Sequence, residues 1–400
     1  MHLAVALTGT GWHPASWRDT AARPDRIIDI GYWTEIVQLA EAGGVDFVTL
    51  EDGLAVQSST LLRADDRTDE LRGQLDAVLT LAALAPRTSE IGLIPTVNVT
   101  HSEPFHVSSQ IASLDWASHG RAGLRPQITF RADDSRNIGR RATPQLTDDD
   151  ITDPVKISTR LTDLFDDAAH YLGSVRDLWD SWDDDAVVRD ASAFRYIDRD
   201  RLHRLTPDAN RFRPLGPSIT PRSPQGQPIV VALGHAPIPY RLAAREADIV
   251  FITPHTDADV IATVREVREI ETLDRPTRYP PLAIYVDITV LLADDTASAA
   301  ERRAALDADH PGTWSSDSRI FSGTAEELAA LVAAWNALGI DGFRLRPAVL
   351  PTDLSHIATA LVPILQDQGQ RPTVTSPGTL RSRLGLAVPE SRFRRSASAR

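Results

Sequence analysis

Eight short apolar runs recur along the chain, and longer amphipathic stretches separate them. The runs are rich in Val, Ile and Leu and lack a clean alternation of apolar and polar residues, which is typical of parallel strands buried on both faces. They lie at residues 2–7, 46–50, 91–97, 122–128, 229–233, 249–252, 283–292 and 342–345. We therefore expect eight buried strands.

Stretches with helical spacing of apolar residues alternate with these runs. They lie at residues 29–42, 74–84, 103–117, 161–182, 238–247, 257–273, 325–338 and 353–368. Strands and helices that alternate through right-handed crossovers form either an open doubly wound sheet or a closed barrel. Eight units favour the closed (β/α)8 TIM barrel.

Two segments interrupt this alternation. Residues 130–160 are rich in Asp, Arg and Thr, and residues 189–227 hold several prolines and little periodicity. We interpret both as insertions at the C-terminal face of the strands, one of them a possible lid, and not as linkers between domains. The expected organisation is one barrel domain at residues 1–370 and a C-terminal tail at 371–400. The basic end of that tail, residues 392–400, is interpreted as a solvated terminus.

Composition excludes several classes of protein. The net charge is -13 and the body of the chain has no basic patch, so we expect no nucleic-acid partner. Cysteine is absent, which excludes disulfide scaffolds and thiolate chemistry. No uninterrupted run of 18 apolar residues and no signal peptide is found, which predicts a soluble cytoplasmic protein without membrane contact.

Polar residues follow most of the apolar runs, at the strand ends where a barrel carries its active site. They are Trp12, His13, Glu51, Asp52, Thr96, Asn98, Thr100, His101, Arg125, Thr129, Arg131, Gly234, His235, His255, Arg344 and Arg346. Glu51 and Asp52 have an alternative interpretation as caps of the next helix, and each histidine as an ordinary loop residue. Arg125 is more specific because it lies in an apolar strand beside Pro126. Its anionic partner is either a structural carboxylate or a ligand phosphate.

Other catalytic patterns are absent from the sequence. No His-x-His pair supports a metal site, so we expect none. Glycosidase chemistry needs two acids at two strand ends, and the one obvious pairing uses Glu103, which has the position of a helix N-terminal residue. Neither a G-x-G-x-x-G nor a phosphate-loop pattern occurs.

Several distinctive blocks span nearly the whole chain. They include Trp12-His-Pro-Ala-Ser-Trp-Arg18, Ile91-Gly-Leu-Ile-Pro-Thr-Val97, His119-Gly-Arg-Ala-Gly123, Leu178-Trp-Asp-Ser-Trp182 and Thr379-Leu-Arg-Ser-Arg-Leu-Gly-Leu386. In this order they resemble the nitrilotriacetate and long-chain-alkane branch of the luciferase-like flavin-dependent monooxygenases. The resemblance implies a (β/α)8 barrel that binds FMN at its C-terminal face. It also implies that reduced FMN, supplied by a separate flavin reductase, oxygenates a small organic substrate with dioxygen.

The same resemblance implies a cofactor site, residue by residue. Asp52 matches an acid near the flavin ring, Thr96 a small hydroxyl residue, and Gly234 the glycine of the phosphate turn. The site also includes His235 and Thr129. This chain departs from the family at three places. Arg125 replaces an Asn that binds flavin, Ala236 stands where the phosphate turn has a serine, and a His-Asp-x-Arg-Tyr segment is missing near residues 148–159.

These departures leave alternatives open. A deazaflavin could replace FMN, or the chain could be a flavin-free relative, including a non-catalytic binding or interaction protein. No catalytic side chain is assigned. The first helix carries Trp33, Val37 and Leu39, and this wide apolar coverage predicts a homodimer or a higher assembly.

Overall fold

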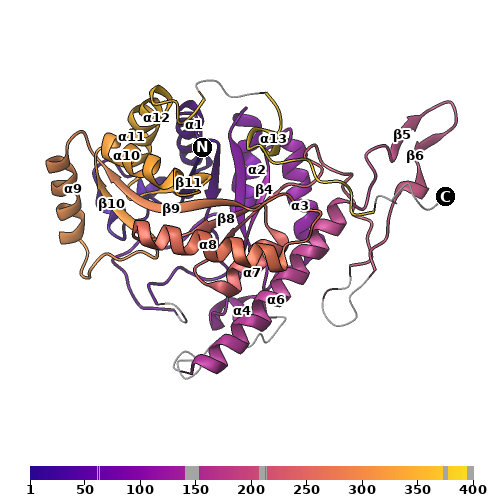
Figure 1. Cartoon of the computed structure of the whole chain (residues 1–400), viewed down its shortest axis with the longest axis horizontal. Helices are drawn as coiled ribbons and strands as arrows, with labels where there is room; N and C mark the ends of the chain where they lie inside the picture. The colour runs from indigo at the N-terminus through magenta and orange to yellow at the C-terminus, as the bar shows by residue number, and fades with distance from the viewer. Residues whose placement is uncertain are drawn as a thin grey trace.

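Eight parallel strands close into a barrel in the computed structural model, which describes residues 1–60, 62, 64–139, 153–206, 212, 214–372 and 377–393. Around the barrel, the order is β1-β2-β3-β4-β7-β8-β9-β11, and β11 pairs with β1. Figure 1 shows the strands at the centre of the molecule, with β8, β9 and β11 labelled. Their bounds are β1 His2–Leu7, β2 Phe47–Leu50, β3 Gly92–Asn98, β4 Gly123–Gln127, β7 Ile229–Leu233, β8 Ile249–Ile252, β9 Ala283–Leu292 and β11 Gly342–Pro347. The TIM-barrel prediction is confirmed, and each predicted strand is present.

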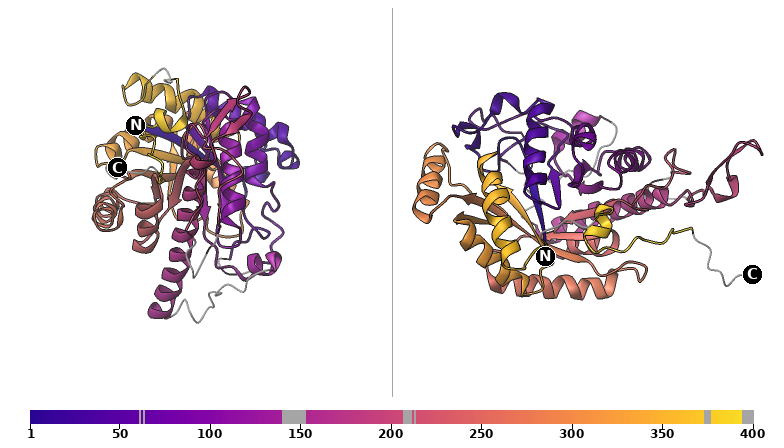
Figure 2. Two further views of the ribbon diagram at one scale, coloured as in Figure 1. Left: turned by 90° about the vertical axis from the view of Figure 1, so that its right-hand side faces the viewer. Right: turned by 90° about the horizontal axis from the view of Figure 1, so that it is seen from above.

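Helices surround the barrel, as the view from above in Figure 2 shows. They are α1 Ile30–Ala42, α2 Ala77–Leu84, α3 Pro104–Ala117, α4 Ala132–Ile138, α6 Pro154–Trp179, α7 Pro237–Glu246, α8 Asp257–Asp274, α9 Thr296–Ala308, α10 Ala325–Asn336, α11 Thr352–His356, α12 Val362–Asp367 and α13 Leu380–Arg383. Side chains cap the start of several of them. At the start of α8, the Thr256 hydroxyl accepts from the Asp259 N–H, and the Asp259 carboxylate accepts from the Thr256 N–H.

Some elements carry no clear sequence signal. Helix α9 is alanine-rich and buries only Ala299 and Leu306, so it lacks an apolar stripe. Strand β10 (Arg319–Gly323) is largely half-exposed and pairs with residues 288–292 of β9, beyond the part of β9 that pairs with β8. An antiparallel hairpin, β5 (Val187–Asp190) and β6 (Arg195–Ile197), projects from the barrel on the right of Figure 1.

The apolar core has two parts. Alternate strand residues such as Leu3 and Val5 face outward and pack under the helices. The others face the barrel interior, where Phe47, Ile94 and Tyr285 fill the end at which the strands begin. This arrangement is the one expected of a barrel whose strands are covered on both faces.

The C-terminal segment closes that end of the barrel. Leu380 is fully buried there, and Gly92 leaves room for it, since a Cβ at Gly92 would lie 2.5 Å from the Leu380 side chain. Arg392 is also held, with its guanidinium 2.7 Å from Asp177. The interpretation of the basic end as solvated is therefore wrong for Arg392 and Phe393, and residues 394–400 lie outside the described residues.

The first helix faces its own barrel. Trp33 is 4% exposed and Val37 is fully buried, both within the core of this chain. Two of the three residues on which the dimer prediction rested are therefore used in folding and do not support it, and the oligomeric state stays a prediction. In the predicted insertion at 130–160, α4 and the start of α6 are seen, and residues 140–152 lie outside the described part. No helix in the described part is long and apolar enough to cross a membrane.

Candidate functional site

A layer of ionic side chains lies inside the barrel above its apolar end. Successive residues of a strand point to opposite faces, so residues two apart share the interior. On β9 this places Asp287 two positions beyond the interior residue Tyr285. The strand register then sets Arg344 beside Asp287 and Arg125 beside Thr96. Charged groups from several strands therefore meet at the C-terminal mouth.

Arg125 is paired with a carboxylate of the protein. Its Nη1 donates to Glu51 Oε2 at 2.7 Å and to Thr96 Oγ1 at 2.9 Å. Burial lowers the pKa of Arg125, and the negative charge of Glu51 opposes that effect. Of the two partners that the sequence left open, the structure shows the carboxylate. Glu51 is thus an ionic partner and not a helix cap.

A second cluster surrounds Asp287. Arg344 Nε donates to Asp287 Oδ1 at 2.7 Å, and Arg346 Nε donates to Asp287 Oδ2 at 3.0 Å. Arg346 also donates to Asp317 Oδ2 at 3.2 Å. Burial by itself would raise the pKa of Asp287, but the two guanidinium groups lower it. With Glu51 and Arg125, this makes three arginines and three carboxylates, so the layer is close to neutral.

His235 lies at the edge of this layer. Its Nδ1 is 2.8 Å from Thr253 Oγ1, and its Nε2 is 3.5 Å from Asp317 Oδ2. Burial lowers the pKa of His235, and Asp317 counteracts this only in part. Burial would raise the pKa of Asp317, but Arg346 lowers it to about 2. At neutral pH the histidine is therefore uncharged and the aspartate ionised.

The turn that holds His235 begins helix α7. Gly234 is required by packing, since a Cβ there would lie 2.7 Å from the Tyr240 ring. Ala236 is the N-cap residue and offers no side-chain bond, and prolines stand at 237 and 239. Of the first three residues of α7, Ile238 alone keeps an N–H. The turn therefore has fewer donors for an anion than an ordinary helix start.

The loop after β1 lies over the mouth. Trp12 Nε1 donates to the Ala6 carbonyl at 2.9 Å, and the Arg346 guanidinium stacks over the indole, 4.7 Å from the ring centre. His13 is buried, accepts from the Ala15 N–H at 3.1 Å and lies 3.3 Å from Asp307. Trp12 therefore contacts the site, whereas His13 holds the loop, as the alternative interpretation of the histidines had it.

Two predicted residues are engaged outside this layer. Asp52 Oδ2 accepts from the Ala77 N–H at 3.0 Å, at the start of α2, and Oδ1 accepts from Gln74 at 3.0 Å. Burial raises the pKa of Asp52. The Thr129 hydroxyl donates to Asp134 of α4. Asp52 therefore caps the start of α2, which is the second of its two interpretations from the sequence. A cofactor contact from Asp52 or Thr129 stays a prediction.

Among the predicted residues, the structure brings Thr96 and Arg125 into contact and places His235 near them. It adds Asp287 and Asp317, which sequence reasoning did not single out. The sequence could have indicated Asp287, because it is the one acidic residue in the apolar strand 283–292 and lies on the same face of the strand as Tyr285. Asp317 had none, since it lies in the irregular segment before β10.

Some buried polar atoms at the mouth have no hydrogen-bond partner within the described part of the chain. They are Glu51 Oε1, Asn98 Nδ2 and Arg125 Nε. Buried polar groups of folded proteins are nearly always hydrogen-bonded, so unmatched ones need an explanation. One acceptor and two donors at neighbouring strand ends fit a ligand with a mixed hydrogen-bonding edge.

The chain is similar along its whole length to known monooxygenases. Residues 8–125 match the family described as luciferase-like monooxygenase. The chain is 26% identical to N-acetyl-S-(2-succino)cysteine monooxygenase of Bacillus subtilis, over 98% of each chain. It is 28% identical to nitrilotriacetate monooxygenase component A of Aminobacter aminovorans, over 98% of this chain and 97% of that one.

The solved structures agree on the fold. EDTA monooxygenase from a Chelativorans species superposes with a TM-score of 0.80 at 21% identity, over 97% of this chain and 98% of that one. The ordered sequence blocks, the closed barrel and these full-length similarities agree with one another. The chain is similar along its whole length to monooxygenases, and residues 8–125 match the luciferase-like monooxygenase family.

Proposed function

We propose that this protein is a flavin-dependent monooxygenase that uses reduced FMN and dioxygen to oxygenate a small organic substrate. One observation carries the proposal: the similarity to monooxygenases runs from end to end of the chains compared, so it includes both the barrel and its insertions. A separate flavin reductase would supply the reduced cofactor. When bound, reduced flavin supplies the electrons that activate dioxygen, and the protein supplies binding and orientation.

The unpartnered atoms at the mouth suit the polar edge of a flavin ring. Asn98 Nδ2 and Arg125 Nε would donate to ring carbonyl oxygens, and Glu51 Oε1 would accept from a ring N–H. Because Glu51 and Thr96 already hold the Arg125 guanidinium, the donor is fixed in place before a ligand arrives. Trp12 would cover the ring and keep water from it.

The cofactor phosphate would lie at the start of α7. A helix N-terminus attracts anions, and His235 adds a charged donor beside it at acidic pH, below its lowered pKa. Two features oppose tight binding: the prolines at 237 and 239 lack N–H groups, and the Asp317 carboxylate is 3.5 Å from His235 Nε2. We therefore expect weak, salt-sensitive binding of FMN, with the ring contacts contributing most of the affinity.

A flavin titration tests the proposal. Purified protein is titrated with FMN in its oxidised and reduced states, and oxygen uptake is followed with an NADH-dependent flavin reductase present. Asn98→Ala should weaken flavin binding roughly 2- to 10-fold, the effect of one hydrogen bond. Asn336→Ala is the matched control, because Asn336 lies on α10 at the opposite end of the barrel.

Three results would count against the proposal. Equal affinity of the two variants would remove Asn98 from the site. Binding of a deazaflavin in preference to FMN would favour the deazaflavin alternative. Failure to bind FMN in either redox state would favour a flavin-free protein.

A further inference from the structure

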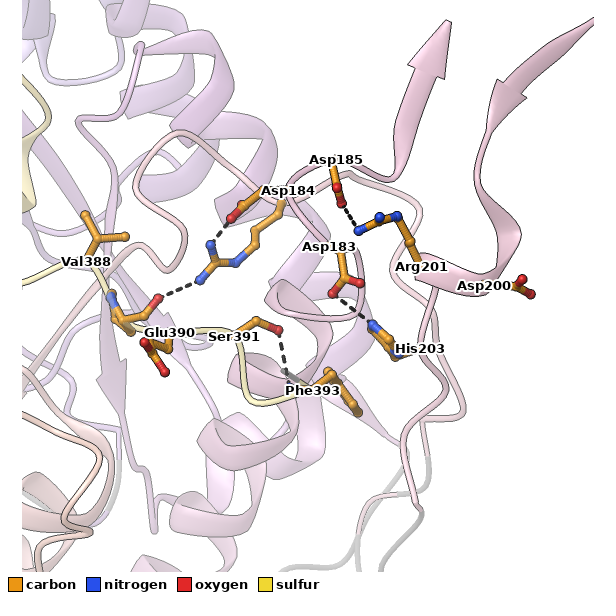
Figure 3. A pocket seen from close by; sticks show the side chains of 12 residues that line it. Asp183, Asp184, Asp185, Asp200, Arg201, His203, Val388, Glu390, Ser391 and Phe393 are labelled. Atoms are coloured by element: carbon orange, nitrogen blue, oxygen red, sulfur yellow. Dashed lines mark hydrogen bonds and ion pairs between the residues drawn. The ribbon is translucent and has the colours of Figure 1, made fainter. Parts of the chain in front are cut away.

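A wide cleft lies at the base of the β5–β6 hairpin, with a volume of about 1330 Å³. Figure 3 shows that charged side chains in it face one another: Asp183 lies 2.9 Å from His203, and Asp185 pairs with Arg201. Because these charges are compensated within the chain, they stabilise the base of the hairpin and do not by themselves indicate a ligand. The barrel mouth differs from this cleft, since buried polar atoms there have no hydrogen-bond partner among the described residues.

The Glu51–Arg125 pair offers one such atom from each partner. Glu51 Oε2 and Arg125 Nη1 bond to each other at 2.7 Å, whereas Glu51 Oε1 and Arg125 Nε have no hydrogen-bond partner in the part of the chain that the structure describes. One atom accepts and the other donates. A ligand that bonds to both atoms therefore contacts a carboxylate and a guanidinium at once, and it experiences the field of both charges.

The other arginines of the layer are compensated by a different carboxylate. Arg344 Nε donates to Asp287 Oδ1 at 2.7 Å, and Arg346 Nε donates to Asp287 Oδ2 at 3.0 Å. Arg344 Nη1 also lies 3.8 Å from Glu51 Oε1, which is beyond hydrogen-bond distance. The positive charge of Arg125 therefore depends mainly on Glu51 for its compensation.

Burial makes this compensation important for a bound ligand. Both side chains of the pair are largely shielded from solvent, so water screens their charges weakly. At an effective dielectric constant of about 20, charges a few ångströms apart interact several times more strongly than they do in bulk water. Removing the charge of either partner should therefore change the affinity for an ionic ligand strongly and the affinity for a neutral ligand much less.

The two oxidation states of a flavin differ in ring charge. The oxidised ring is neutral, whereas the fully reduced ring loses a proton near neutral pH and becomes an anion. Arg125 without its partner would favour the anionic ring, and Glu51 without its partner would disfavour it. As a balanced pair, the two side chains change the relative affinity for the two states little.

We propose that Glu51 sets the relative affinity of the barrel mouth for oxidised and reduced flavin, because it neutralises Arg125 beside the ring. The inference rests on the proposed function, since it requires a flavin at the mouth. With Glu51 ionised, charge gives reduced FMN little advantage over oxidised FMN. Oxidised FMN should therefore compete with reduced FMN for the site.

Flavin titrations in both oxidation states test this inference. Oxidised FMN is titrated in air and chemically reduced FMN without oxygen, and the ratio of the two dissociation constants is compared between variants. Glu51→Gln should raise the preference for reduced FMN at least about 10-fold over wild type. Arg125→Met should lower it at least about 5-fold, a smaller effect because Arg344 still lies near Glu51.

The double variant Glu51→Gln/Arg125→Met separates charge from hydrogen bonding. It has lost both charges, so its ratio should return to within about 2-fold of wild type, although it binds both forms of FMN more weakly. Glu90→Gln is the matched control, because Glu90 pairs with Arg383 at 3.3 Å just before β3, at the opposite end of the barrel. The control should leave the ratio unchanged.

The outcomes distinguish this inference from the proposed function. If FMN binds but the ratio is the same in wild type and in the two single variants, the inference is overturned and the proposed function stands. A double variant whose ratio departs from wild type more than either single variant also overturns it, since the pair would then act through hydrogen bonds alone. Failure to bind FMN in either state overturns both. Urea unfolding shows which variants are folded, and Arg125→Met decides the inference if Glu51→Gln does not fold.

Discussion

Glu51→Gln removes the charge that balances Arg125 at the barrel mouth. The two side chains lie 2.7 Å apart and are 18% and 8% exposed. The remaining layer would hold three arginines against Asp287 and Asp317. Glu51 also has a weaker neighbour, Arg344, whose Nη1 lies 3.8 Å from Glu51 Oε1.

The cost follows from this burial. Removing one partner of a buried pair costs about 3–5 kcal/mol because it leaves an unbalanced charge. Glutamine still accepts from Arg125 and Glu51 keeps some contact with water, so we expect about 2–3 kcal/mol for Glu51→Gln. Arg125→Met should cost about 1–2 kcal/mol, since Arg344 still compensates Glu51. The double variant should lose less than the sum of the two, with a coupling of about 1–2 kcal/mol.

Urea unfolding of the four proteins at neutral pH measures these differences from the midpoints and slopes. Glu35→Gln is the control, because Glu35 is 49% exposed in its pair with Arg23 and should cost less than about 1 kcal/mol. Additive effects of the Glu51 and Arg125 substitutions would refute the view that each compensates the other. So would a Glu51→Gln variant that is no less stable than the control.

Three further predictions concern other parts of the chain. His235 attracts phosphate when it is protonated, and burial lowers its pKa below the usual 6.5. The affinity for FMN, measured by calorimetric titration, should therefore fall as the pH rises toward about 6.5. His235→Ala, or riboflavin in place of FMN, should abolish this trend, and a trend that persists in both would contradict it. Leu380→Ala opens a cavity at the end of the barrel that the C-terminal segment closes, and should lower the free energy of unfolding by about 2–4 kcal/mol. An unchanged unfolding midpoint would contradict a stabilising role of this segment. Asp248 lies 2.9 Å from both Arg176 and Arg381, and these charges hold its pKa below the usual range against the effect of burial. Its stabilisation should be present above about pH 4 and lost on acidification, and Asp248→Asn should cost about 3–5 kcal/mol at neutral pH without that acid-dependent loss.

The barrel strands could be predicted from the sequence because a strand that is buried on both faces consists of consecutive apolar residues. A strand such as 249–252 must be apolar throughout, wherever its neighbours lie. The same criterion did not predict α9, because its many alanines make the buried and exposed faces similar in hydrophobicity. It did not predict β10 either, because that strand is half-exposed. The positions of the strand ends also followed from the sequence, and with them the presence of Arg125 at the mouth.

Only the tertiary structure decided which charges meet. Arg125 pairs with Glu51, 74 residues away, and Arg381 in the C-terminal segment pairs with Asp248, the residue before β8. Residue type shows that a buried cation needs an anion, but the partner depends on which strand ends the closed barrel brings together. The basic end at residues 392–400 resembled solvated chain because its composition is polar, and the packing of Arg392 depends on the carboxylates of Asp177 on α6 and Glu246 on α7. Local pattern determines what each segment buries, and the closure of the barrel determines what each buried charge touches.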